Sequence, residues 1–277
     1  MAIRSILSVV GADQGDGDVK RVAALCEETG AHLSVLVVSL AAPPPIGEYA
    51  AMVSDAWMEE RQAALDALKA RAATITDNLA GSPVSCDVSV EYPESAWAEE
   101  VIGRRGRYAD LTVLGPELMA GDTLKAKAFE GALFTSGKPV LLLPEGAATL
   151  KPRTVLVGWD SRIEATRAAR EALDILAQAK DVRLTLVDPE EDDHGHGAEP
   201  GADAAAYLAR HGVKVAVDRL PGMGMSAAET LRRHAIDTGA EMIVMGGYGH
   251  SRLRQRIFGG VTRSMLEQPP VPVFLAR

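Results

Sequence analysis

The segment TVLVGWD, residues 154–160, is a short β-branched run that ends in a glycine and an aspartate. The same pattern opens the chain, where the aliphatic run at residues 3–10 ends at Gly11, Ala12 and Asp13. Each run precedes a helical stretch and is typical of a strand buried in a parallel sheet. One strand-and-helix pattern therefore occurs twice in the 277 residues.

The same order of elements follows both runs. Strands separated by whole helices cannot be joined as hairpins, so each half is expected to be a doubly wound, five-stranded parallel sheet with helices on both faces. A small polar stretch at residues 146–151 separates the halves, and we predict a first domain over residues 1–147 and a second over 148–277. The predicted strands cover residues 3–10, 33–40, 84–90, 111–115 and 140–143, then 154–157, 182–187, 214–220, 242–245 and 273–275.

Two helix signals stand out in the second half. A single helix is predicted over residues 162–179, directly after Asp160. Ser226 and Glu229 have the spacing of a capping box, which predicts that another helix begins there.

The composition excludes several classes of protein. No apolar run approaches the ~20 residues that cross a bilayer, and the N-terminal residues do not follow the pattern of a signal peptide. The net charge of -9 argues against a nucleic-acid footprint, which needs a basic face. Cys26 and Cys86 lack paired spacing and are expected to be buried free thiols. We therefore expect a cytoplasmic protein that contacts neither membranes nor nucleic acids.

A glycine-rich segment follows the fourth strand of the second half: GGYGHSRLRQRIFGGVT, residues 246–262. Glycines let backbone N–H groups approach phosphate oxygens closely. Gly259 and Gly260 come just before a predicted helix, whose unpaired N–H groups favour an anion. In an open parallel sheet, ligands bind at the carboxyl ends of the strands, where this segment starts. The segment therefore predicts a phosphate site.

The glycine spacing and the repeated α/β pattern together resemble the universal stress protein family, specifically its tandem two-domain members. The resemblance covers essentially the whole chain. It implies the adenine nucleotide alpha hydrolase-like fold, ATP as the ligand, with Mg or Mn held mainly by the phosphates, and a role in the stress response. It also implies that the closing strand at residues 271–273 is a dimerisation edge.

Carried over to this sequence, the resemblance implies a site at the ends of three strands and in the glycine segment. Asp160 would contact the adenine or the ribose, Val187 the adenine, and the glycines the ribose and phosphates. The predicted site residues are Gly158, Trp159, Asp160, Val187, Gly246, Gly249, His250, Gly259, Gly260, Val261 and Thr262.

One position departs from the family pattern. Nucleotide-binding members usually have a serine or threonine where this chain has Gly260, so a hydroxyl contact worth roughly 1 kcal/mol is lost. Residues 246–263 contain four arginines, which could hold phosphate or could be solvated or paired with acids elsewhere. They are Arg252, Arg254, Arg256 and Arg263.

The first half lacks the glycine pattern. Gly115 is followed by Pro116 and Glu117, so one backbone donor is missing, and the charges of Glu117 and Asp122 repel a triphosphate. Asp13 is expected to be a turn or cap residue. We therefore expect a degenerate first half that offers a packing or regulatory surface.

Three functions are compatible with these sequence features. The first is a regulatory protein whose nucleotide state alters its surface for a protein partner, as a homodimer or an intramolecular pseudo-dimer. The second is a nucleotide-free dimeric scaffold. The third is a slow ATP hydrolase, for which only His250 and Ser251 offer a base or nucleophile, so no catalytic residue is assigned.

A metal site is not expected either. Acidic and histidine side chains do gather in one loop, but its glycines give no fixed scaffold for a metal. These side chains are Asp192, Asp193, His194 and His196.

Overall fold

The computed structural model describes residues 3–43, 55–121, 123–146, 148–189, 199–248 and 260–277. Contacts between residues divide the chain into an N-terminal unit, Ile3–Lys138, and a C-terminal unit, Pro139–Arg277. This division falls before the strand at residues 140–142, whereas the sequence places a domain boundary after it, between residues 147 and 148. The position of that boundary stays a prediction.

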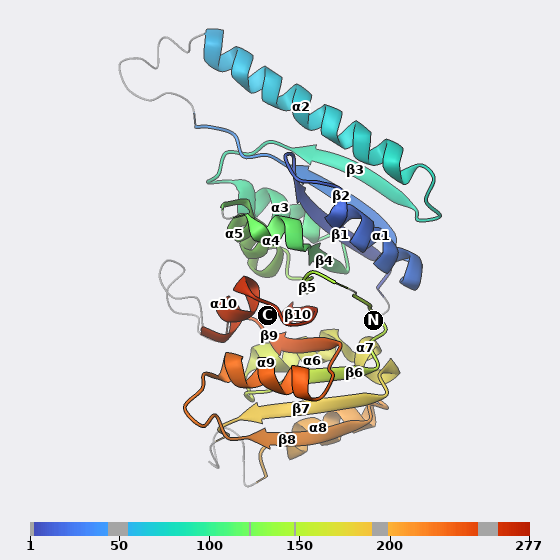
Figure 1. Cartoon of the computed structure of the whole chain (residues 1–277), viewed down its shortest axis with the longest axis vertical. Coiled ribbons are helices and arrows are strands. Elements are labelled where there is room, and N and C mark those ends of the chain that lie inside the picture. The colour runs from blue at the N-terminus through green and yellow to red at the C-terminus, as the bar shows by residue number, and fades with distance from the viewer. Residues whose placement is uncertain (1–2, 44–54, 122, 147, 190–198, 249–259) are drawn as a thin grey trace. The chain divides into compact units, whose positions relative to one another are not determined.

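The N-terminal unit contains a parallel sheet with the strand order β3-β2-β1-β4. The long helix α2 packs on β2 and β3, while α1 packs on β1 and β2 (Figure 1). The elements are β1 Ser5–Gly11, α1 Gly17–Thr29, β2 His32–Val38, α2 Asp55–Leu79, β3 Cys86–Glu91, α3 Ala98–Gly106, β4 Leu111–Leu114, α4 Pro116–Ala120, α5 Thr123–Glu130 and a π-helical turn, Gly131–Thr135.

The C-terminal unit contains a sheet with the order β5-β10-β9-β6-β7-β8. All neighbouring pairs are parallel except β5 with β10. Figure 1 shows α9 and α10 in front of this sheet and α6, α7 and α8 behind it. The elements are β5 Val140–Leu142, β6 Thr154–Gly158, α6 Ile163–Glu171, α7 Leu173–Gln178, β7 Asp181–Val187, α8 Ala202–Arg210, β8 Val215–Leu220, α9 Ala227–Asp237, β9 Met242–Gly246, α10 Gly260–Glu267 and β10 Val273–Ala276.

The central strands carry the cores. Every residue of β4, β5 and β10 is buried, and these strands read as continuous apolar runs, as expected for strands covered on both faces. The strands at the outer edges, β3 and β8, are only partly buried. The outer strands β3 and β8 therefore contribute less to the cores than β4, β5 and β10 do.

The predicted fold class, α/β with mostly parallel doubly wound sheets, is confirmed. Strands β6 to β10 form the five-stranded parallel sheet expected of the second half. The helix expected over residues 162–179 is two helices, α6 and α7, that meet at Ala172. Helices α4 and α5 were not predicted, although Pro116 at the first helical position is a known start signal.

The closing strand of the chain is paired within the C-terminal unit. Strand β5 runs antiparallel to β10, with Val273 opposite Leu142 and Leu275 opposite Val140. The edge for which the resemblance implies dimerisation is therefore covered by a strand of the same chain.

Both cysteines are free thiols. Cys26 on α1 is buried, and this burial raises its pKa to about 12. Cys86 at the start of β3 is only half-buried, because β3 is an edge strand. The prediction of two buried thiols is thus confirmed for Cys26 and wrong for Cys86.

Within the described ranges, no helix combines the length and apolarity needed to cross a membrane.

Candidate functional site

The strand order of the C-terminal unit reverses between β6 and β9. From β6 the chain moves outward to β7 and β8, then returns to the other side of β6 as β9. Gly158 at the end of β6 lies opposite Met245 near the end of β9. Loops that leave two such strands diverge to opposite faces of the sheet, which opens a crevice at their carboxyl ends.

A cavity of about 240 Å³ lies at this crevice. Its size is just below the lower end of the range of small-molecule sites, about 300 Å³. Its walls come from the ends of β6, β7 and β9 and from the first turns of α9 and α10. The lining residues are Gly158, Trp159, Asp160, Arg162, Thr185, Val187, Ala227, Leu231, Met245, Gly246, Tyr248, Gly260, Val261 and Thr262.

The structure brings most of the predicted site residues together. Those that line the cavity are Gly158, Trp159, Asp160, Val187, Gly246, Gly260, Val261 and Thr262. The other predicted residues, Gly249, His250 and Gly259, lie outside the described residues.

Six lining residues were missed by sequence reasoning: Arg162, Thr185, Ala227, Leu231, Met245 and Tyr248. Two patterns could have found some of them. Thr185 lies two residues before Val187 on β7, so both side chains share one face of the strand. Ala227 and Leu231 are four residues apart on the capped helix α9 and face the same side.

The turn after β6 fixes Asp160 at the cavity. The Trp159 backbone N–H donates to the Thr185 carbonyl at 2.9 Å, and the Asp160 Oδ1 accepts from the Arg162 backbone N–H at 3.1 Å. Arg162 Nε also lies 3.8 Å from the other carboxylate oxygen of Asp160. With its side chain 56% exposed, this carboxylate retains acceptor sites for a ligand hydroxyl.

Left-handed backbone conformations follow four strands of the C-terminal unit, and one of them, at Tyr248, lines the cavity. Among the described residues, four non-glycine residues have positive φ, and each comes within three residues of the end of a different strand, β6, β7, β8 or β9. Such conformations are uncommon and cluster at functional sites, where the surrounding structure holds them. They are Ser161, Asp188, Met223 and Tyr248.

The surroundings of Gly246 and Gly260, two glycines of the motif, differ. A Cβ on Gly246 would lie 2.6 Å from the Ala165 backbone nitrogen, so the end of β9 must pass close to α6. Among the described residues, no atom lies within 4 Å of a Cβ built on Gly260. Packing therefore explains Gly246, whereas the first residue of α10 has open space around it.

Thr262 joins the two ends of the glycine segment. It is buried, and its Oγ1 accepts a hydrogen bond from the Tyr248 backbone N–H at 3.3 Å. Arg263 donates to Glu267 at 2.7 Å within α10, so the pairing with an acid considered for the arginines is present here. The other three arginines of the segment fall outside the described residues.

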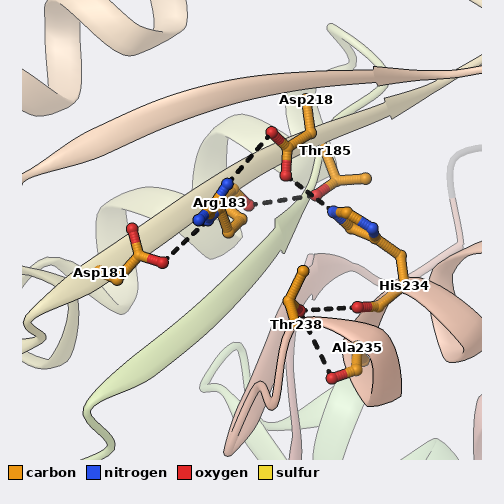
Figure 2. Close-up of polar contacts among 7 residues, drawn as sticks. All are labelled: Asp181, Arg183, Thr185, Asp218, His234, Ala235 and Thr238. Carbon is orange, nitrogen blue, oxygen red and sulfur yellow. Dashed lines mark hydrogen bonds and ion pairs between the residues drawn. The ribbon is translucent and has the colours of Figure 1, made fainter.

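A polar network holds α9 on the sheet beside the cavity (Figure 2). His234 Nε2 and Asp218 Oδ2 are 2.7 Å apart, and Asp218 Oδ1 lies 3.6 Å from Arg183 Nη1. Thr185, which lines the cavity, is the strand partner of Asp218. The network therefore links β7 and β8 to the helix that carries Ala227 and Leu231.

The described residues contain no group of three or more histidine, cysteine or acidic side chains placed to hold a metal ion. The loop of Asp192, Asp193, His194 and His196 lies outside them.

Known proteins resemble this chain both in sequence and in fold. Residues 151–277 match the model of the universal stress protein family. A universal stress protein from Synechocystis sp. is 32% identical over 74 residues, which span 27% of this chain and 25% of that relative.

Two solved structures have a similar fold over nearly the whole chain. A universal stress protein from Archaeoglobus fulgidus has a TM-score of 0.67 at 19% identity, covering 98% of this chain and 96% of its own. A protein from Pseudomonas aeruginosa, described as a putative universal stress protein, has a TM-score of 0.57 at 18% identity, with 99% and 93% covered. The match to the universal stress protein family thus covers residues 151–277, the part of the chain that contains the candidate site.

Proposed function

We propose that the C-terminal unit binds an adenine nucleotide, ATP, and that the protein is a regulatory member of its family acting in the stress response. The observation that carries this proposal is the cavity at the β6–β9 crevice, which most of the residues implied by the family resemblance line together. A ligand crevice at the point of strand reversal is the usual binding position in open α/β sheets.

The chemistry of the walls suits the three parts of a nucleotide. Val187, Leu231 and Met245 give apolar surface for a base. Asp160 is an acceptor for ribose hydroxyls. The first N–H groups of α10, which have no partner within the helix itself, suit phosphate oxygens, and the bare Cα of Gly260 permits close approach. A Mg or Mn ion would be held mainly by the phosphates.

We propose binding rather than catalysis as the activity, with ligand state altering the surface offered to a protein partner. The pairing of β5 with β10 supports an intramolecular arrangement of the closing strands over a homodimer built on the same edge. A slow ATP hydrolase remains the alternative, and loss of phosphate release in a His250→Ala variant would favour it.

ATP is expected to raise the unfolding temperature of the purified protein. Ligand at ~100 times its dissociation constant stabilises the native state by roughly 2.7 kcal/mol, because it binds the folded form alone. Thermal unfolding with ATP, with AMP and without nucleotide measures this shift. The scaffold alternative predicts the same unfolding temperature in all three samples.

Gly260→Ser is expected to tighten ATP binding. The new side chain has open space and would restore the hydroxyl that family members usually carry, worth about 1 kcal/mol, or roughly fivefold in affinity. Isothermal titration calorimetry of both proteins measures the change, with Gly260→Ala as the control for the added Cβ. Equal affinities of the Ser and Ala variants would show that the hydroxyl makes no contact with the ligand.

A further inference from the structure

The N-terminal unit has the same crevice position as the C-terminal unit. Its strand order, β3-β2-β1-β4, places the reversal between β1 and β4. Two helix starts meet there: α1 begins at Gly17, after β1, and α4 begins at Pro116, after β4. In this unit a short helix therefore stands where the C-terminal unit has its glycine segment.

The carboxylate of Asp18 is buried at the start of α4. Asp18 is only 1% exposed. Its two carboxylate oxygens accept hydrogen bonds from the backbone N–H groups of Glu117 at 3.1 Å and Leu118 at 2.9 Å. A Cβ on Gly115 would lie 2.2 Å from the Asp18 carboxyl carbon. Position 115 therefore requires glycine, because the Asp18 carboxylate occupies the space that a Cβ would need.

Glu117 of α4 makes the corresponding contact with the start of α1. Its Oε1 accepts from the Gly17 backbone N–H at 3.0 Å, at the start of α1. Its Oε2 is buried without a hydrogen-bond partner in the described part of the chain. Each helix start is thus capped by a carboxylate from the other helix, and these contacts satisfy N–H groups that would otherwise face the crevice.

A third side chain completes the closure. Gln14 Oε1 accepts from the Gly11 backbone N–H at 2.7 Å, and Gln14 Nε2 donates to the Glu117 carbonyl at 3.3 Å. The turn after β1 is therefore tied directly to α4.

The charges around Asp18 act in opposite directions. Burial raises the pKa of Asp18 and the nearby charge of Glu117 raises it further, while the two backbone hydrogen bonds and Arg21 lower it, and the net direction is upward. Nearby, Asp16 is paired with Arg71 of α2 at 2.7 Å, and Asp13 is exposed. No charged side chain comes from β4, which reads LTVL.

We propose that Asp18 and Glu117 form a proton-sensitive carboxylate lock, which joins α1 to α4 and closes the crevice of the N-terminal unit. The lock is separate from nucleotide binding in the C-terminal unit. When Asp18 is ionised, its buried charge and the nearby charge of Glu117 oppose the closed form, and a proton on Asp18 relieves this repulsion.

The sign of the pH dependence follows from the raised pKa. A carboxyl group that holds its proton more tightly in the native state stabilises that state fully below the usual Asp value of 3.8. This contribution is lost as the pH rises through the native pKa of Asp18. The lock is therefore tighter below the native pKa of Asp18 and looser above it.

Hydrogen exchange on the full-length protein tests the lock. In the wild type, the protection factors of the Gly17, Glu117 and Leu118 amides are expected to fall between pH 4 and pH 8, after correction for intrinsic exchange rates. Asp18→Ala is expected to lower the protection factors of the Glu117 and Leu118 amides at least about tenfold at either pH, because both amides lose their carboxyl acceptor. Asp13→Ala, in the same turn but exposed, serves as the matched control and leaves them unchanged.

Asp18→Asn separates charge from shape. It keeps the size of the side chain and is expected to remove most of the pH dependence of these three amides. If the Asn variant keeps the wild-type pH dependence, or if Asp18→Ala and Asp13→Ala behave alike, the lock is overturned.

Discussion

Replacing Ala227 with phenylalanine is expected to abolish the ATP-dependent rise in unfolding temperature. Ala227 is the first residue of α9, is half-buried and lines the cavity of about 240 Å³. A benzyl group at this position would take up much of that volume. The whole ligand stabilisation, roughly 2.7 kcal/mol at ~100 times the dissociation constant, should be lost.

The fold itself should tolerate this change, since the side chain enters an existing cavity and displaces no packed neighbour. Ala209→Phe is the matched control, because it adds the same group on an exposed position of α8 in the same unit. Calorimetric titration with ATP should detect binding to the control alone. Wild-type affinity in the Ala227→Phe variant would exclude this cavity as the nucleotide site.

Gly246→Ala is expected to destabilise the C-terminal unit. The added Cβ would lie 2.6 Å from the Ala165 nitrogen and 2.7 Å from the Glu164 carbonyl carbon, and these backbone atoms of α6 cannot move without shifting the helix. Overpacking of this kind costs about 1–3 kcal/mol. Each kcal/mol lowers the melting temperature of a domain of 150–250 residues by about 2–4 °C.

Gly158→Ala gives the same chemical change at the neighbouring strand end. There the nearest atoms to a Cβ belong to Leu231 and Met245 at 3.5 Å, an ordinary contact, so stability should stay close to that of the wild type. Thermal unfolding without ligand compares the two variants. Equal melting temperatures would mean that packing does not require glycine at position 246 and that close approach of a ligand is the better explanation.

Helices and strands were predicted well where the signal lay in residues close together in the sequence. The strand predicted over residues 111–115 is found at residues 111–114, and the capping box of Ser226 and Glu229 is present with both of its hydrogen bonds. The break between α6 and α7 at Ala172 was not predicted, because alanine favours the helix interior.

The candidate site was predictable in position and only partly in composition. The order of strands and helices placed the crevice, because parallel strands must end at one edge and the chain must reverse somewhere. Arg162 and Tyr248 were missed, since no periodicity shows which loop side chains turn inward. The contact of Gly246 with α6 was not predicted, because glycine spacing cannot distinguish contact with a ligand from contact with a helix.

The amino-acid sequence by itself determined a twofold α/β chain, the edge of the sheet where a ligand would bind, and the absence of a glycine segment from the first half. The tertiary structure alone decided that Asp18 caps residues 99 and 100 positions away, and that β5 lies against β10. The reason is physical: helix and strand patterns depend on neighbours within a few residues, whereas a buried carboxylate finds its donors only after the topology has brought distant segments together.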